Sequence, residues 1–445
     1  MMKAFLDKLM QAVKEAGIEA AEAYVVERES FEAMTHDSEI VHYESNATRG
    51  LGFRGLKGGR MGYASTEAFD DEAIAQLVKG VLESAELCED TDEEFLYDGS
   101  EEAPEIDLYD SALESVTAEQ KLALALQTEE KAKAYDKRIA DVSDNLIGTG
   151  KATVRIVNTY GMRREYAENY AMLFSAPTAR EGERVSSGSY GQVERSFDKL
   201  DGDAVARIAA ERAVGWLHAS SMPSGKYRVV FLNEVMTNLM GVFATIFSAK
   251  TAQKGLSLLS GKLGETIASP CVTLIDDPLL AHGLNSRPFD AEGVPSKAHT
   301  VIESGVFQTF LHNLKTARKD GVTTTGNASK GYAATVGVSP SNLYFQPGQK
   351  SLDELLASAG SGVVITDVMG LHAGANAVSG DFSLLSKGYR FKDGKRAEAV
   401  EQITVAGNFY ELLKSIREFA NDLRFPDGGK GSASVDAGEL SVSGQ

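Results

Sequence analysis

Cysteine is scarce in this chain, and long apolar runs are missing. The 445 residues contain only two cysteines, Cys88 and Cys271, which lie far apart. Small secreted scaffolds that depend on disulfides carry cysteines at much higher density, so this class of protein is excluded. No run approaches the roughly 18 apolar residues of a membrane-spanning helix. Asp7 and Lys8 interrupt the first apolar segment, which therefore predicts an amphipathic helix rather than a signal peptide, and we expect a cytoplasmic protein.

Positive charge is also in short supply. The formal net charge is -19, and the basic groups Arg163-Arg164 and Lys392/Lys395/Arg396 are small. Proteins that bind nucleic acid need a basic surface to neutralise phosphates, so direct binding of nucleic acid is not expected.

Several catalytic and nucleotide-binding motifs are missing. The chain has neither a P-loop nor the G-x-S-x-G turn of serine hydrolases. Gly50-Leu-Gly-Phe-Arg-Gly55 matches G-x-G-x-x-G, but a second strand rather than a helix is expected after it. The dinucleotide fold requires a helix at this point, so we interpret these glycines as part of a sheet.

The seven histidines do not show the spacing of a zinc peptidase. None of them forms a pair at i, i+4 or i, i+5. His36 and His42 are six residues apart and are interpreted as surface residues. A site built from His282, His299 and His312 remains an alternative, since residues far apart in the sequence can converge in the fold.

The first half of the chain predicts sheets flanked by helices. We expect a helix at the start, a meander of about four strands up to residue 66, and a helix from Asp70 to about Cys88. An acidic surface connection covers 89–115, and Thr117 opens a helix with a capping box. Further strands are expected at 139–147, 151–158, 162–176 and 184–197, followed by a helix from Asp201 to His218.

The stretch 219–226, rich in Ser, Pro and Gly, predicts a linker. We therefore expect an N-terminal domain over 1–218, with subregions of about 1–90 and 116–218, and a C-terminal domain over 226–445. The second half opens with a strand at 227–232 and a helix at 233–250, and it ends with a helix at 409–421. Antiparallel sheets with separate helices place the chain in the α+β class.

Polar side chains in the loops of the second half are the candidate site residues. Asp276, Asp277, Asp290 and Glu292 are interpreted as turn residues, because Asp and Glu beside Pro or Gly are common there. The glycine-rich stretch 370–395 predicts close backbone packing at the floor of a cleft. The polar groups that we expect to line a peptide cleft are Thr325, Asn327, His372, Asn376 and Asn408.

Several segments of the second half resemble one known family. They include LSGKLGETIASPCVTLIDDP, SRPFDAEGVPSKAHTVIESGVFQTFLHNLKTA and GANAVSGDFSLLSKGYRFKDGKRAEAVEQITVAGNFYELLKSI, with TRGLGFRGLKGGRMGYAST in the first half. In order and spacing they resemble the TldD/PmbA family, once described as modulators of DNA gyrase, over nearly the whole chain.

The resemblance implies one of two branches. TldD-like members carry the zinc motif H-E-x-x-x-H on the helix that opens the C-terminal domain. The helix expected at 233–250 has Glu234 but no histidine, so the chain resembles the TldE/PmbA branch, which lacks the metal site. No catalytic residue, metal ligand or cofactor is then expected in this chain, and zinc is expected in a TldD-like partner.

The resemblance further implies a complex that degrades unfolded peptides and matures some peptide antibiotics, the microcins. This chain would form a heterodimer with the TldD-like metallopeptidase subunit, or a homodimer. Two alternatives remain: a self-sufficient homodimeric peptidase with an unrecognised metal site, and a non-enzymatic regulator linked to DNA gyrase.

Overall fold

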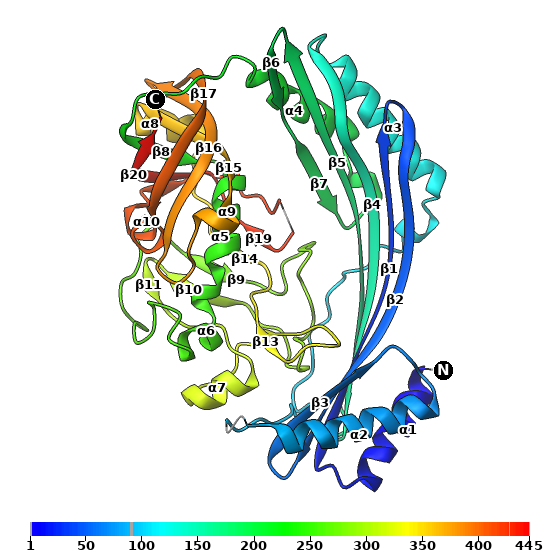
Figure 1. Ribbon diagram of the computed structural model, residues 1–445. Coiled ribbons are helices and arrows are strands. Elements are labelled where there is room, and N and C mark those ends of the chain that lie inside the picture. The colour runs from blue at the N-terminus through cyan, green and yellow to red at the C-terminus, as the bar shows by residue number, and fades with distance from the viewer. Residues whose placement is uncertain (1, 90–91, 427, 445) are drawn as a thin grey trace.

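A computed structural model describes residues 2–89, 92–426 and 428–444, and it has the expected α+β class (Figure 1). The described residues of the first half contribute one seven-stranded antiparallel sheet in the order β3-β2-β1-β4-β5-β6, with β7 also paired to β5. Its strands are β1 Ala20–His36, β2 Glu39–Lys57, β3 Arg60–Thr66, β4 Ile139–Asn158, β5 Arg163–Glu181, β6 Arg184–Ser187 and β7 Tyr190–Glu194.

Glycines explain where the strand predictions fail. The expected meander has three strands before residue 67 rather than about four, and β4 is one strand where two were expected. Gly150 lies inside β4 because a Cβ there would stand 2.6 Å from the Tyr170 ring on β5, so this glycine makes room for a neighbour rather than a turn. Gly188 has the opposite effect: it separates β6 from β7, where the backbone passes close to Ala213 of α4.

Four helices of the first half begin close to the expected positions. They are α1 Met2–Glu15, α2 Asp71–Leu87, α3 Ala118–Ala134 and α4 Gly202–Gly215. Asp70 accepts a hydrogen bond from the Ala73 amide at 2.8 Å, and both hydrogen bonds of the Thr117 capping box are present. Asp201 likewise caps α4. Short 3-10 turns occupy Ser111–Ser115 and Phe197–Lys199.

Two further sheets and a two-stranded pair form the framework of the second half. A six-stranded sheet contains β8 Gly225–Phe231, β15 Gly362–Met369, β16 Asp381–Lys392, β17 Lys395–Asn408, β18 Glu418–Phe419 and β20 Val435–Ser443. A five-stranded sheet contains β9 Leu274–Asp276, β10 His299–Glu303, β11 Val306–Phe307, β14 Leu343–Phe345 and β19 Lys430–Gly431. The pair consists of β12 Ala328–Ser329 and β13 Gly337–Val338.

The helix expected over 233–250 is interrupted. It contains α5 Asn233–Phe243, a 3-10 turn at Ala244–Phe247, and α6 Ala249–Gln253. Ser248 is extended because Phe247 and Ala249 exchange backbone hydrogen bonds with Leu311. Around α5 lies the main core of this half, in which Phe243 stacks on Phe409 at 4.5 Å between ring centroids.

The remaining helices of the second half are short. They are α7 Leu314–Asp320, α8 Leu352–Ala359, α9 Leu371–Gly374 and α10 Phe409–Ser415. The expected capping box at Ser351 is present. The last helix ends six residues earlier than expected, because the Arg417 amide donates to the Asp436 carbonyl and the chain continues as β18.

Four buried ionic side chains join the two halves, and we call them the buried joint. Arg54 of β2 donates to Glu22 of β1 and to Glu292 of the second half, at 3.0 and 2.9 Å. Lys330 donates to Glu22 at 2.6 Å. The exposed fractions of these four side chains range from 0 to 6%. Charges this deep are tolerated only when paired, so the joint fixes how the halves meet.

The G-x-G-x-x-G segment lies in β2, as expected of a sheet segment, and it includes Arg54 of the joint. A Cβ on Gly52 would stand 2.2 Å from the Tyr332 carbonyl oxygen. The glycine therefore lets the 330–334 loop of the second half lie directly on the sheet.

Candidate functional site

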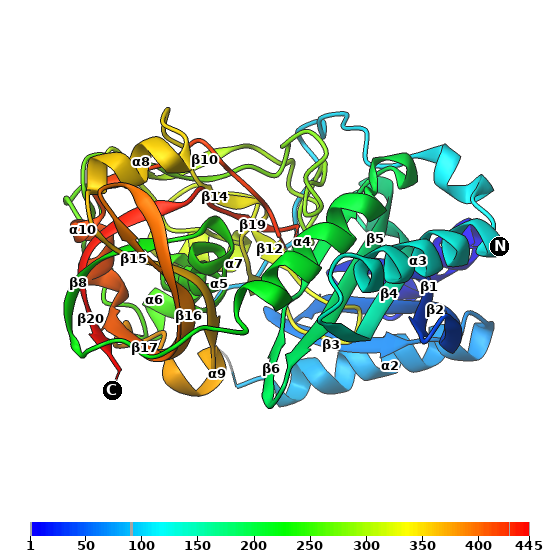
Figure 2. The ribbon, with the colours of Figure 1, turned by 90° about the horizontal axis from the view of Figure 1, so that it is seen from above.

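A cavity of about 1210 Å³ lies where the two halves face each other. One wall comes from β4, β5, β7 and α4, and the other from α5, β15, β16 and residues around Arg424. Figure 2 shows α4 between the large sheet and the sheets of the second half. A concave site between two halves of a protein is a common place for ligand binding.

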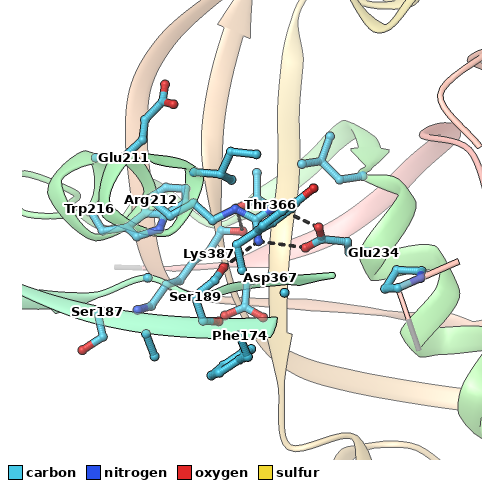
Figure 3. A pocket seen from close by; sticks show the side chains of 18 of the residues that line it. Phe174, Ser187, Ser189, Glu211, Arg212, Trp216, Glu234, Thr366, Asp367 and Lys387 are labelled. Carbon is cyan, nitrogen blue, oxygen red and sulfur yellow. Dashed lines mark hydrogen bonds and ion pairs between the residues drawn. The ribbon is translucent and has the colours of Figure 1, made fainter. Parts of the chain in front are cut away.

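Glu234 lines the cavity and is held by two arginines. Arg212 of α4 donates to both of its carboxylate oxygens at 2.9 Å, as Figure 3 shows. Arg424 donates to Oε1 at 2.5 Å. Both guanidinium groups also lie over the Tyr190 ring, at 5.2 and 4.4 Å. We call Glu234, Arg212 and Arg424 the cavity clamp. The Glu234 carboxylate accepts three charge-assisted hydrogen bonds from the two arginines.

An asparagine directly precedes Glu234, and another follows four residues later. Asn233 and Asn238 give the helix the pattern N-E-x-x-x-N, which has the spacing of H-E-x-x-x-H with an amide at each histidine position. The Asn233 amide donates to the Asp422 carbonyl at 2.9 Å, and Asn238 lines the cavity. Zinc in proteins is bound by imidazole, thiolate or carboxylate, so these residues do not fit a zinc ion.

Asp367 and Lys387 complete the polar part of the wall (Figure 3). The Asp367 side chain reaches the solvent of the cavity but is flanked by protein. This partial desolvation raises the pKa of its carboxyl, although the positive charge of Lys387 acts in the opposite direction. Arg396 stands over the Tyr389 ring at 4.5 Å. The cavity thus offers charged, hydrogen-bonding and aromatic groups that suit a polar chain molecule.

The histidines do not assemble a metal site. In the ranges that the structure describes, just one group of three or more His, Cys, Asp or Glu side chains brings its ligand atoms within 4.8 Å, namely His36, Asp37 and Asp141. Asp37 is exposed and paired with Lys133, and none of the three lines the cavity. Burial lowers the pKa of His299 and of His312, but they and His282 do not form such a group.

Comparisons with known proteins place the chain in a family. It matches three models in succession: PmbA/TldA metallopeptidase domain 1 over 21–85, the central domain over 111–215, and the C-terminal domain over 224–444. The structure of a proposed modulator of a DNA gyrase from Thermotoga maritima is 34% identical, covers 100% of both chains and superposes with a TM-score of 0.93. The chain belongs to the PmbA/TldD metallopeptidase family.

Relatives with names from both branches are similar to the chain. The Metalloprotease PmbA homolog of Haemophilus influenzae is 28% identical, covering 95% of this chain and 93% of its own. The Metalloprotease TldD homolog of the same organism is also 28% identical, with 88% and 84% covered. TldE from Thermococcus kodakarensis has the same fold, with a TM-score of 0.91 at 20% identity and 99% and 100% covered. Since both names match at equal identity, the branch within the PmbA/TldD family has to be argued from residues.

Two of the predicted cleft residues are buried structural groups. The Thr325 hydroxyl accepts from the His312 amide at 2.6 Å. The Asn327 side chain donates to Asp276 at 2.6 Å. Both are buried, and neither lines the cavity between the halves. Their part in peptide binding stays a prediction.

The other three predicted residues shape the glycine-rich segment. His372 is exposed on α9. Asn376 accepts from the amides of Val378 and Ser379, while Asn408 caps α10 and donates to the Ser379 carbonyl at 2.8 Å. These bonds hold the 376–381 turn against α10, away from the residues that line the cavity. A contact with peptide or partner also stays a prediction for them.

The turn interpretation of the four acidic residues is incomplete. Asp277 and Asp290 do accept from amides two residues onward, at 2.8 and 2.9 Å. Asp276 instead lies buried in β9, and burial raises the pKa of its carboxyl. Glu292 is part of the buried joint, and its other oxygen accepts from the Leu314 amide at 2.8 Å. Asp276 and Glu292 are therefore buried hydrogen-bond acceptors, and the sequence pattern of a turn does not reveal that role.

The cavity clamp itself was missed from the sequence. The spacing N-E-x-x-x-N was an available signal for Glu234, since it aligns with the family motif. Arg212 and Arg424 gave no local signal, because both act across long separations in the chain.

Proposed function

We propose that this chain is the non-catalytic, PmbA/TldE-type subunit of a peptidase complex in which a TldD-like subunit supplies the zinc. The observation that carries the proposal is the cavity clamp. Where a zinc peptidase of this family has two histidines and a free glutamate, this chain has two asparagines and a glutamate bound by Arg212 and Arg424. Both oxygens of this glutamate already accept from cationic guanidinium groups, which makes it a poor base for a metal-bound water.

The cavity supports a role in holding substrate. Its volume of about 1210 Å³ suits a stretch of unfolded peptide, and its wall carries polar, charged and aromatic side chains. In the proposed complex, this chain forms part of the chamber around the substrate, and a zinc ion held by the partner would supply the Lewis acid for hydrolysis. Degradation of unfolded peptides and maturation of microcins in the cytoplasm are the corresponding cellular roles, and this chain needs no cofactor for them.

The self-sufficient peptidase is the less well supported candidate. It requires metal ligands, and the described side chains offer just the half-exposed group of His36, Asp37 and Asp141, in which Asp37 already pairs with Lys133. A group outside the cavity gives no enclosed surface on which to hold peptide.

Metal content and peptidase activity of the purified chain test the proposal. We expect substoichiometric zinc and no cleavage of an unfolded protein such as casein by this chain alone. Cleavage is expected after a TldD-like subunit is added, and not after a variant of that subunit with its motif glutamate replaced by glutamine. Near-stoichiometric zinc and chelator-sensitive cleavage by this chain alone would refute the proposal.

A further inference from the structure

A second, much smaller cavity lies between the large sheet and the loop that follows β9. Its volume is about 50 Å³. Tyr24 of β1 and Tyr166 of β5 line it from the first half, and Arg287 lines it from the second. We call it the Arg287 cavity. One water needs roughly 10–15 Å³ of such space, so the cavity has room for a small ion together with a water or two.

The Arg287 guanidinium has no hydrogen-bond or ion-pair partner among the described residues. Its Nε and Nη2 atoms are both buried. Two other buried arginines do have partners: Arg54 donates to two glutamates, and Arg195 donates to the Asn169 and Gly283 carbonyls. Enclosing a charge without a counter-charge is costly, so this guanidinium is expected to have a ligand.

The two tyrosines offer further donors to the same cavity. Neither hydroxyl forms a hydrogen bond to another residue that the structure describes. Burial raises the pKa of Tyr24 and of Tyr166, so both keep an O–H group that can donate. Lys330 also lines the cavity and stands 4.9 Å over the Tyr24 ring, although its ammonium is already paired with Glu22.

The nearby carboxylates do not neutralise Arg287 by contact. Asp290 lines the cavity, but its two oxygens accept from three backbone amides at 2.9 to 3.0 Å. Burial raises the pKa of Asp290, to about 7, and also raises the pKa of Glu168 and of Asp276. The charges of these three groups reach Arg287 through space, but none of them forms an ion pair with it.

We infer that the Arg287 cavity binds one small monovalent anion, held by the guanidinium and by the hydroxyls of Tyr24 and Tyr166. The anion supplies the counter-charge that no carboxylate provides, and charge-assisted hydrogen bonds reach it from both halves of the chain. It therefore strengthens the contact between the 286–296 loop and the large sheet. The site needs neither zinc nor a TldD-like subunit, so it goes beyond the proposed function and can fail independently of it.

The first experiment measures the melting temperature of the full chain while sodium chloride replaces sodium gluconate at constant ionic strength. Gluconate is too large for the cavity, and chloride is the probe. We expect the melting temperature to rise with the logarithm of the chloride concentration, because a ligand that binds only the folded state stabilises it by mass action. Arg287→Met keeps an unbranched side chain without the charge, and it should abolish the rise.

The matched control is Arg207→Met, which removes an arginine of α4 whose side chain is 58% exposed. It should keep the chloride dependence of the wild type. Tyr24→Phe combined with Tyr166→Phe keeps both rings and should raise the chloride concentration needed for half of the effect by at least about threefold. This pair tests the site even if Arg287→Met folds poorly.

The outcomes are distinct. A melting temperature of the wild type that does not depend on chloride, or an equal rise in Arg287→Met, would overturn the inference. A larger rise with sodium formate than with sodium chloride would support the site and assign it to small carboxylates.

Crystals grown in sodium bromide locate the anion directly. We expect an anomalous peak within hydrogen-bond distance of the Arg287 guanidinium. Water alone at this position would reject the inference. A bromide peak without any chloride dependence of melting would mean binding at crystal concentration only, and it would reject the inference as well.

Discussion

Two ion clusters link the halves of this protein, and they differ in how much water reaches them. The buried joint contains Arg54, Glu22, Lys330 and Glu292 and is almost fully enclosed. The cavity clamp contains Glu234, Arg212 and Arg424, whose side chains are 20 to 31% exposed. The same pairing chemistry therefore serves as an enclosed structural contact in one place and, in the other, lines the cavity between the halves.

Burial decides the electrostatics of the joint. Desolvation alone would raise the pKa of Glu22, but the charges of Arg54 and Lys330 outweigh it and hold that pKa below its usual value. For Lys330 desolvation wins, and its pKa is lowered. The 2.6 Å contact between the Lys330 ammonium and Glu22 favours the charged pair.

The largest expected effect comes from breaking the joint. Glu22→Gln leaves Arg54 and Lys330 with Glu292 as their remaining close partner, and removing one member of a buried ion group costs about 3–5 kcal/mol. A large fall in the melting temperature is expected in calorimetry. An effect as small as that of a surface substitution would mean that water enters the joint.

The joint also predicts acid sensitivity. Since the folded-state pKa of Glu22 is lowered, its contribution to stability is present above its unfolded pKa and is lost as the pH falls below that value. The melting temperature of the wild type should therefore fall more steeply than that of Glu22→Gln between neutral pH and about pH 3.5. Parallel curves would exclude Glu22 as a source of the acid dependence.

The next effect comes from the backbone contact beside the joint. Gly52→Ala places a methyl group 2.2 Å from the Tyr332 carbonyl oxygen, so the 330–334 loop has to move. Overpacking of this kind costs roughly 1–3 kcal/mol, and chemical denaturation can measure it. If the variant is as stable as the wild type, the loop does not lie on the sheet in solution.

A smaller loss is expected in the cavity clamp. Glu234→Gln keeps hydrogen-bond acceptors near Arg212 and Arg424 but removes the charge, and we expect a cost of about 1 kcal/mol at this partly hydrated site. The comparison with Glu22→Gln is the informative one. Equal losses in the two variants would mean that the clamp is as dry as the joint.

The smallest effect should be a gain. Gly241 lies on the exposed side of α5, and a Cβ there would meet no atom within 4 Å. Gly241→Ala should therefore stabilise the protein by about 0.5–1 kcal/mol, as expected for an interior helix position. A destabilised variant would indicate that another molecule contacts this face of α5.

Local patterns predicted the beginnings of elements well. Asp70, Thr117 and Ser351 cap helices as expected, because a cap depends on residues within one turn. Strand lengths were harder to predict. In the sequence alone Gly150 suggests a turn, whereas in the structure it lies within β4 and makes room for the Tyr170 ring. Tertiary contacts also shortened two helices, through Leu311 in one case and Asp436 in the other.

The site was less predictable than the fold. The buried joint and the cavity clamp each combine residues from both halves, and no spacing in the sequence reveals such pairs. The predicted cleft residues were chosen for polarity in glycine-rich loops, but Asn327 and Asn408 use that polarity to hold the loops themselves. The absence of histidine from the helix that opens the second half could be read from the sequence, because a helix is one continuous segment.

The acidic connection after α2 attaches the halves at a further point. Asp92, Glu93 and Glu94 pair with Lys319, Arg318 and Lys315 of α7. Together with the chain crossing after α4, the buried joint and the cavity clamp, this connection fastens the two halves at several separate places. A frame fastened in this way cannot swing open about any one of them. For the proposed function this means that a peptide would enter the cavity as an extended chain, and that folded proteins would be excluded by their width rather than by their sequence.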